Sequence, residues 1–385
     1  MIKKTISVLL ICCIAIGCIP GAIFAEETAN GLELSCRSAI LMEQSTGCVL
    51  YEHNADTPYA MASVTKVMTM LLIMEALDSG KITLEEMVVG SERAKSMGGS
   101  TIFLDAGEAL SVHDMLKGIA VASANDACVA MAEHIAGSEE GFVAMMNSRA
   151  AELGMKNTVF KNTNGLDAEG HYSSARDIAI MSAVLLKHKK IFDYTTIWMD
   201  SLRDGKFQLA NTNKLIRFYK GANGLKTGST DDALFCLSGT AKREGMQLIA
   251  VVMGAPSSPK RFADASKLLD YGFANYRVSQ VTGAGETVGE AIVEKGIFES
   301  VPLLAANDYT HLAKKGDGGK IETEIVYNTP CKAPIQQGDV LGRIRILQDG
   351  KEIASVDAIA AHAVAKLTYL NILEITLKKW IGTVC

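Results

Sequence analysis

Ser63 and Lys66 lie three residues apart at the start of a long apolar run. Residues at this spacing are neighbours on a helix, so both side chains would lie on one face. A serine hydroxyl beside a lysine amine is a nucleophile with a candidate base, an arrangement suited to acyl transfer. The same residues could instead be a helix-capping serine and a lysine that reaches solvent. For an isolated pair this structural interpretation is favoured.

Two further motifs follow this pair along the chain. Ser123 and Asn125 lie at a predicted turn between helices, where they could face a cleft or simply cap a helix. Lys226, Thr227 and Gly228 head a series of strand signals. Each motif is weak by itself, because such short combinations arise by chance in unrelated sequences.

The elements around these motifs predict a mixed domain with strands at both ends and helices between. The run 64–77 lacks Gly and Pro and is apolar nearly all round, which predicts a buried helix with Ser63 at its first turn. We expect strands at 38–42, 48–51, 235–238 and 248–253, and further helices beginning at Ser111 and spanning 127–135, 142–153, 174–186 and 260–276. This order indicates an α+β domain in which the N- and C-terminal strands share an antiparallel sheet.

The sequence changes character after about residue 281. Glycines separate short segments in which polar and apolar residues alternate, the pattern of half-buried strands, so we expect a small β-sandwich-like domain over 281–362. The tail, 363–385, is amphipathic, and its pattern is helical from Lys366 onward. Its apolar stripe comprises Leu370, Leu373, Leu377, Trp380, Ile381 and Val384. Such a helix could dock on the protein or lie flat on a membrane surface.

The N-terminus has the layout of a signal peptide. Lys3 and Lys4 precede an apolar run, and Ala25 is a small residue directly before acidic, polar sequence. We therefore expect 1–25 to be cleaved from an exported protein whose first domain spans 26–280. An uncleaved membrane anchor and lipid attachment at Cys18 are the alternatives.

Composition excludes several partner classes. The formal net charge is −5 and no Lys/Arg tract is present, which argues against nucleic acid as a partner. The six cysteines that follow the leader are scattered, without metal-like pairs, and we predict no metal or organic cofactor. Free thiols are favoured over a Cys36–Cys48 bridge.

The three motifs occur together in the order and wide spacing found in penicillin-binding proteins and class A β-lactamases. The chain resembles the low-molecular-mass penicillin-binding proteins of the D-alanyl-D-alanine carboxypeptidase family, peptidase family S11, over nearly its whole mature length. Further matching segments are 123–128, 164–177, 224–228, 261–262 and 270–273. The resemblance implies a β-lactamase/transpeptidase-like domain, with an antiparallel sheet flanked by helices, then a small all-β domain and an amphipathic tail.

The resemblance also implies a reaction. Ser63 would attack the carbonyl between two D-alanines of a peptidoglycan stem pentapeptide, and penicillins would acylate the same serine. Lys66, partly buried beside Lys226, would have its pKa lowered enough to act as the base, although which group takes the first proton is disputed in relatives. Ser123 would pass a proton to the leaving D-alanine, and Asn125 would hold Lys66 and the substrate amide.

The resemblance also implies how the substrate would bind. The backbone N–H groups of Ser63 and Ser229 would form the oxyanion hole. Thr227, within the Lys-Thr-Gly motif that Gly228 completes, would bind the terminal carboxylate together with Arg261, and Lys226 would add positive potential. The expected partners are peptidoglycan stem peptides, β-lactam inhibitors and, through the tail, a membrane surface. The expected location is the outer face of the cytoplasmic membrane or the cell-wall space.

Other functions fit parts of the pattern. A class A β-lactamase would need a deacylating glutamate in a Glu-x-x-x-Asn-type loop and a shorter chain, and residues 162–174 contain no such motif. A non-catalytic wall-binding protein could keep the fold, but all the motif residues are present. DD-endopeptidase activity uses the same machinery and stays open.

Overall fold

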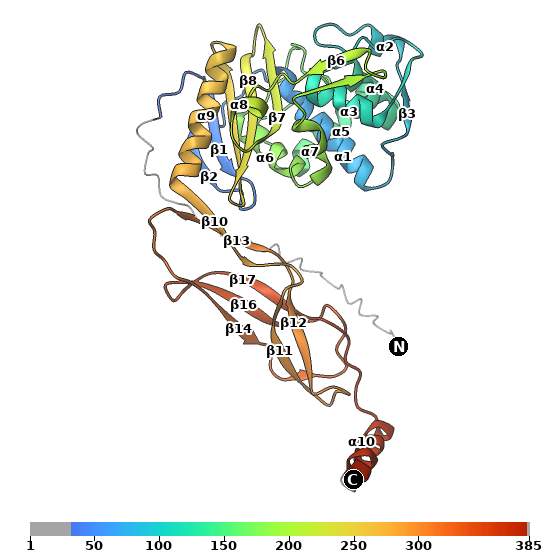
Figure 1. Cartoon of the computed structure of the whole chain (residues 1–385), viewed down its shortest axis with the longest axis vertical. Coiled ribbons are helices and arrows are strands. Elements are labelled where there is room, and N and C mark those ends of the chain that lie inside the picture. The colour runs from blue at the N-terminus through green and yellow to red at the C-terminus, as the bar shows by residue number, and fades with distance from the viewer. Residues whose placement is uncertain (1–31, 383–385) are drawn as a thin grey trace, which may run out of the picture. The chain divides into compact units, whose positions relative to one another are not determined.

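A computed structural model describes residues 32–382 of the chain. The predicted signal peptide, with Cys18, lies outside the described residues, as do Val384 and Cys385 of the tail. The first domain carries a five-stranded antiparallel sheet in the order β2-β1-β9-β8-β7 (Figure 1). Its strands are β1 (Ser38–Glu43), β2 (Val49–His53), β7 (Ala222–Thr230), β8 (Leu234–Arg243) and β9 (Met246–Ala255).

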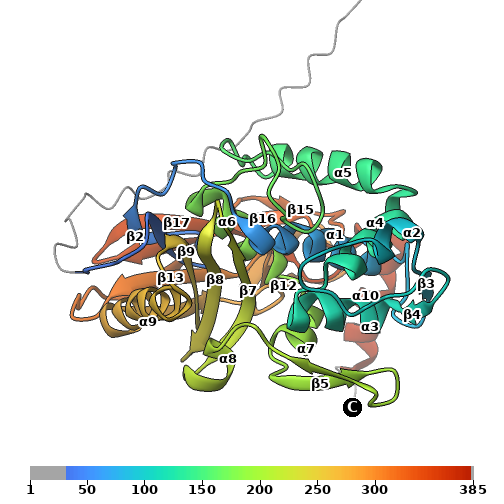
Figure 2. The same cartoon turned by 90° about the horizontal axis from the view of Figure 1, so that it is seen from above.

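The pairing of β1 with β9 confirms that the N- and C-terminal strands share one antiparallel sheet. Strand β9 is buried along its entire length, because helices cover both faces of the sheet. On one face, Gly272 of α9 (Ser258–Asn275) lies against Leu41 and Leu248. On the other, Ser182 of α6 (Ala175–Leu185) hydrogen-bonds Ser238 at 2.8 Å. Figure 2 shows α9 on one side of strands β8 and β7, and α1 (Lys66–Asp78) and α4 (Asn125–Ala136) on the other.

Helices form most of the rest of the first domain. They are α1 (Lys66–Asp78), α2 (Glu92–Lys95), α3 (Val112–Lys117), α4 (Asn125–Ala136), α5 (Glu139–Glu152), α6 (Ala175–Leu185), α7 (Phe192–Thr195) and α8 (Leu215–Phe218). Side-chain caps from Ser111, Ser138, Ser174 and Ser257 fix the starts of α3, α5, α6 and α9. Helix α1 is buried from Lys66 through Met74, which confirms the prediction of an apolar, buried helix.

Short elements connect these helices and strands. Two small hairpins consist of β3 (Met87–Val89) with β4 (Ala109–Ser111), and of β5 (Met199–Leu202) with β6 (Phe207–Ala210). Two 3₁₀ turns, η1 (Ala62–Thr65) and η3 (Lys189–Ile191), precede α1 and α7, and a π-helical turn, η2 (Gly118–Ala122), follows α3.

One local expectation needs correction. Ser63 does not cap or begin the α-helix: it lies in η1, one residue after Ala62, whose φ of 49° is left-handed. Contacts with distant segments impose this turn, so the sequence pattern of the helix does not reveal it. The expectation of free thiols is confirmed for Cys36, which is buried, and for Cys48, which is half-buried.

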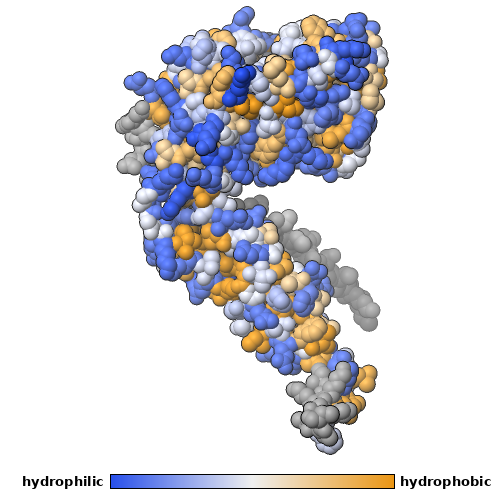
Figure 3. All heavy atoms as spheres, viewed as in Figure 1, coloured by the Kyte–Doolittle hydropathy of each residue, from blue (hydrophilic) through white to orange (hydrophobic). Residues whose placement is uncertain are grey.

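The second domain is all β, as expected. Strand order β14-β16-β17-β12-β11-β15 forms a six-stranded sheet, and β10 pairs with β13. The strands are β10 (Tyr276–Thr282), β11 (Thr287–Glu294), β12 (Ser300–Ala305), β13 (Tyr309–Lys314), β14 (Ile321–Tyr327), β15 (Cys331–Lys332), β16 (Val340–Gln348) and β17 (Lys351–Ala360). The inward side chains of this domain form a separate apolar core. On the molecular surface drawn in Figure 3, apolar residues are scattered among hydrophilic ones.

The tail forms helix α10 (Tyr369–Gly382). It begins three residues later than the predicted start at Lys366. Within residues 32–382, the structure contains no helix with the length and apolar character needed to cross a membrane.

Candidate active site

The turn that carries Ser63 is contacted by two glycines from distant elements. Gly165 belongs to the loop between α5 and α6, and a Cβ there would lie 2.0 Å from the Ala62 carbonyl oxygen. Gly228 belongs to β7, and a Cβ there would lie 2.9 Å from the Ser63 nitrogen. Because no other residue allows such close approach, these glycines bring the loop and the edge strand directly against the backbone of Ser63.

The amine of Lys66 is fully buried beside Ser63. Lys66 Nζ contacts three oxygens: Ser63 Oγ at 2.9 Å, Asn125 Oδ1 at 2.7 Å and the Asn164 carbonyl at 2.6 Å. Burial lowers the pKa of Lys66 to about 8, against a smaller opposing effect of nearby acidic groups. A neutral amine has two N–H groups and one lone pair. With Asn125 and Asn164 taking the N–H groups, the lone pair remains for the proton of Ser63.

Lys226 provides a second buried amine at the site. It extends from β7, and its Nζ donates to the Thr227 carbonyl at 2.8 Å. Burial first, and then the charge of Lys66, lowers the pKa of Lys226 well below its ordinary value. Desolvation is thus the leading cause for both lysines, whereas the sequence interpretation relied on their proximity as well as on partial burial.

Ser123 and Asn125 occupy the predicted turn between helices. Ser123 is buried in the left-handed conformation, with φ 65° and ψ 32°, between η2 and α4. Asn125 is the first residue of α4. Its Oδ1 accepts from Lys66, and its Nδ2 donates to the Gly98 carbonyl at 2.7 Å. The structure therefore brings Asn125 into direct contact with Lys66 and places Ser123 two residues away.

The Lys-Thr-Gly strand meets Arg261 on its other side. Arg261 lies in the first turns of α9, and its Nη1 donates to the carbonyls of Gly228 at 2.9 Å and Cys236 at 3.4 Å. Burial lowers the pKa of Arg261 to about 10. Thr227 Oγ1 donates to Thr212 Oγ1 at 2.7 Å. Ser229 follows Gly228 on β7, opposite Phe235 of β8.

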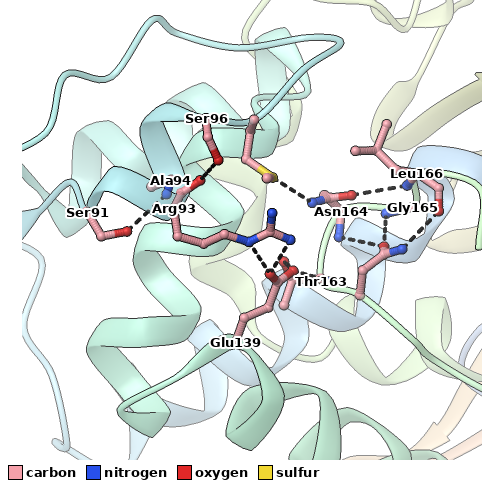
Figure 4. Close-up of polar contacts among 11 residues, drawn as sticks. Ser91, Arg93, Ala94, Ser96, Glu139, Thr163, Asn164, Gly165 and Leu166 are labelled. Atoms are coloured by element: carbon pink, nitrogen blue, oxygen red, sulfur yellow. Dashed lines mark hydrogen bonds and ion pairs between the residues drawn. The ribbon is translucent and has the colours of Figure 1, made fainter.

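The loop that supplies the Asn164 carbonyl is anchored from several sides (Figure 4). Glu139, at the start of α5, accepts from Arg93 at 3.1 Å and from Thr163 Oγ1 at 3.1 Å. Thr69 of α1 donates to the Thr163 carbonyl at 2.6 Å. In Figure 4, Arg93 reaches the carboxylate of Glu139 beside Thr163, and Asn164 turns back to the N–H of Leu166. Anchoring on both sides of residue 164 fixes the carbonyl that binds Lys66.

The sequence showed that segment 164–177 matches the family, but it did not show which atoms the loop 162–174 contributes to the site. The Asn164 contact comes from a backbone carbonyl, which leaves no signature in the residue type. Thr212 likewise lies in no motif. The Asn-Gly-Leu resemblance at 164–166 is the one signal that pointed to this place.

A serine on a short strained turn, a buried lysine bound to it, and an edge strand against its backbone define the penicillin-binding and β-lactamase class of serine enzymes. The family model for D-alanyl-D-alanine carboxypeptidase matches residues 25–257, and the model for the C-terminal domain of penicillin-binding protein 5 matches residues 276–366. The chain belongs to the D-alanyl-D-alanine carboxypeptidase family, peptidase family S11.

Known relatives are similar to this chain over most of its length. The chain is 45% identical to the D-alanyl-D-alanine carboxypeptidase DacF of Bacillus subtilis, across 98% of this chain and 99% of that protein. It is 34% identical to DacC of Escherichia coli, across 87% and 85%. Penicillin-binding protein 5 from Haemophilus influenzae superimposes with a TM-score of 0.73 at 33% identity, covering 88% of this chain and 100% of that one. These similarities confirm the predicted family and fold class.

Proposed function

We propose that this protein removes the C-terminal D-alanine from peptidoglycan stem pentapeptides through an acyl-enzyme on Ser63. The observation that carries the proposal is the 2.9 Å contact between Ser63 Oγ and the fully buried amine of Lys66. Burial lowers the pKa of this amine to about 8, which is close to the physiological pH at which a general base with such a pKa is most effective. Membership of the carboxypeptidase family supplies the substrate class.

In the acylation step, Lys66 accepts the proton of Ser63 while Oγ attacks the carbonyl of the penultimate D-alanine. The backbone N–H groups of Ser63 and Ser229 stabilise the developing oxyanion. The C–N bond then breaks, and Ser123 delivers a proton to the departing D-alanine nitrogen. Water hydrolyses the resulting ester and restores Ser63. Ser63 attacks the carbonyl of a β-lactam ring in the same way, but the resulting ester is hydrolysed slowly.

The substrate carboxylate binds at the end of the site formed by Thr227 and Arg261, with Lys226 and Gly228 of the same strand beside it. Arg261 Nη1 binds the Gly228 carbonyl at 2.9 Å, so the guanidinium places a positive charge directly against the Lys-Thr-Gly strand, where it would attract the substrate carboxylate. Asn125, already bound to Lys66, would hold the substrate amide.

Labelling with fluorescent penicillin and D-alanine release from a diacyl-Lys-D-Ala-D-Ala peptide test this function. We expect both for the native protein and neither for Ser63→Ala. Absence of both in the native protein, or their full retention in Ser63→Ala, would contradict the proposal. Rapid turnover of penicillin would indicate a β-lactamase instead.

We also propose that the protein is exported by cleavage after Ala25 and held on the membrane surface by α10. Apolar side chains of this helix face solvent, with Leu370 78% and Trp380 79% exposed. Truncation before Lys366 should move the protein from the membrane fraction to the soluble fraction. Unchanged membrane association would refute the role of the tail, and a mature N-terminus other than Glu26 would refute the cleavage site.

A further inference from the structure

His171 is a buried histidine of the loop 162–174, outside the three motifs, and its ring contacts Thr65 of the turn η1. Its Nδ1 accepts the backbone N–H of Lys161 at 2.9 Å, so its ring proton resides on Nε2. Nε2 lies 2.8 Å from Thr65 Oγ1. Thr65 Oγ1 in turn donates to the Ala62 carbonyl at 2.8 Å. Three hydrogen bonds in series therefore connect the loop to the residue before Ser63.

The donor and the acceptor of each hydrogen bond in this series are fixed. Burial lowers the pKa of His171 to about 4, so the ring is neutral at physiological pH and carries one N–H. That N–H points to Thr65, whose oxygen accepts it. The hydroxyl proton of Thr65 is then available only for the Ala62 carbonyl.

The Ala62 carbonyl matters because it belongs to the same peptide group as the N–H of Ser63. In a planar trans peptide the C=O and N–H point in opposite directions, so holding one orients the other. Ala62 has a φ of 49°, a conformation that costs free energy for a residue with a Cβ and persists only where the surroundings enforce it. Gly165 and Gly228 contact this peptide but donate no side-chain hydrogen bond to it.

We propose that His171 is a positioning residue for the oxyanion hole. Acting through Thr65, it holds the Ala62–Ser63 peptide so that the Ser63 N–H faces the charge that develops on the substrate carbonyl. The same loop supplies the Asn164 carbonyl to Lys66, so one segment orients both the donor and the base. This inference rests on the proposed function, because it presumes that the Ser63 N–H binds the oxyanion.

Two pairs of variants test the proposal. His171→Leu removes both ring nitrogens, whereas His171→Gln keeps a side-chain donor and an acceptor. Thr65→Val removes the hydroxyl with little change of shape, whereas Thr65→Ser keeps it. Loss of an oxyanion donor typically costs about 10²–10³ in kcat, and a donor that is present but misdirected should cost less, roughly tenfold. We expect that loss for the Leu and Val variants and near-native kcat for the Gln and Ser variants.

The readouts separate positioning from general destabilisation. A peptidyl boronic acid forms a tetrahedral adduct that uses the oxyanion hole, so its affinity should fall by the same factor as kcat in the Leu and Val variants. KM for the peptide should stay near the native value. If His171→Leu fails to fold, the Thr65 pair decides the question, with thermal unfolding as the check on both.

Native kcat and native boronate affinity in a folded Leu or Val variant would overturn the proposal. A loss confined to KM, or an equal loss in the Gln and Leu variants at equal thermal stability, would do the same. These outcomes are distinct from failure of the proposed function, in which the native protein itself neither binds penicillin nor releases D-alanine.

Discussion

Lys66 Nζ lies 2.9 Å from Ser63 Oγ, with the lysine fully buried and bound also to Asn125 and to the Asn164 carbonyl. A charged amine would be costly in this position, and burial lowers the pKa of Lys66 to about 8. Four elements meet at this contact: η1, α1, α4 and the loop before α6. Their convergence supports the proposal that Ser63 is the nucleophile and Lys66 its base.

This pKa predicts how acylation depends on pH. Below about pH 8 the amine of Lys66 carries its proton and cannot accept one from Ser63, so the rate constant for acylation should fall as the pH falls. It should rise through this pH and level off above it. The measurement is the second-order rate of penicillin labelling as a function of pH.

Lys66→Arg is the matched variant for this experiment, because a guanidinium stays protonated throughout that range. It should label slowly at every pH. A native rate that is independent of pH, or that is highest in acid, would contradict the assignment of Lys66 as the base.

Gly165→Ala should disable the site. The new Cβ would lie 2.0 Å from the Ala62 carbonyl oxygen and cannot be accommodated without moving the loop away from η1. Displacement of a catalytic group by about 1 Å can cost about 100-fold, and we expect a loss of that order in kcat/KM for D-alanine release.

Gly170→Ala is the control for backbone strain. Gly170 lies in the same loop with a φ of 76°, close to the 89° of Gly165, but a Cβ there would meet only the flexible end of Lys161 at 3.2 Å. Both variants should lose about 1–3 kcal/mol of stability from the left-handed backbone. Equal activity in the two variants would show that the approach of Gly165 to Ala62 is unimportant.

Glu139→Ala should loosen the loop that carries Asn164. Its removal leaves Arg93 and the hydroxyl of Thr163 without their carboxylate, at an expected cost of about 1–3 kcal/mol in the free energy of unfolding. The rate of D-alanine release should fall roughly tenfold, because the carbonyl that orients Lys66 is no longer fixed.

Glu140→Ala is the matched control, because Glu140 also lies in the first turn of α5 but is exposed. Loss of favourable charge at the helix start is common to both variants. Denaturant unfolding and D-alanine release measured on both would separate the two contributions. Identical behaviour of the two variants would refute the anchoring role of Glu139.

Arg261→Leu should reduce discrimination for a free carboxylate. A hydrogen bond to a charged group contributes about 1.5–3 kcal/mol, so KM for the peptide acid should rise tenfold or more. A peptide amide of the same sequence lacks the charge and should be affected much less. Arg217→Leu is the control. Arg217 lies over the rings of Trp198 and Phe218, and its loss should leave KM for the peptide acid near the native value. An equal effect of Arg261→Leu on the acid and the amide would contradict carboxylate binding.

The sequence predicted the sheet, the buried α1 and the family, because these depend on apolar periodicity and on three motifs whose joint order is specific. It also placed Asn125 at the turn where the structure has it, in contact with Lys66. It could not predict the left-handed Ala62, because that conformation is imposed by Gly165 and Gly228 from distant parts of the chain.

Contacts made by backbone atoms could not be predicted from the sequence either. The Asn164 carbonyl would bind Lys66 whatever side chain residue 164 carried. His171 lies within a segment that resembled the family, but only the fold shows that its ring reaches Thr65 and, through it, the Ala62 carbonyl. Residue types predict side-chain chemistry, whereas the orientation of a peptide group depends on the packing around it.

The most direct test of the account is the site of covalent attachment. The protein should be incubated with benzylpenicillin, digested, and analysed by mass spectrometry. The account predicts one penicilloyl adduct, on Ser63, and none in Ser63→Ala. An adduct on another residue, or no adduct on the folded native protein, would contradict the assignment of Ser63 as the nucleophile.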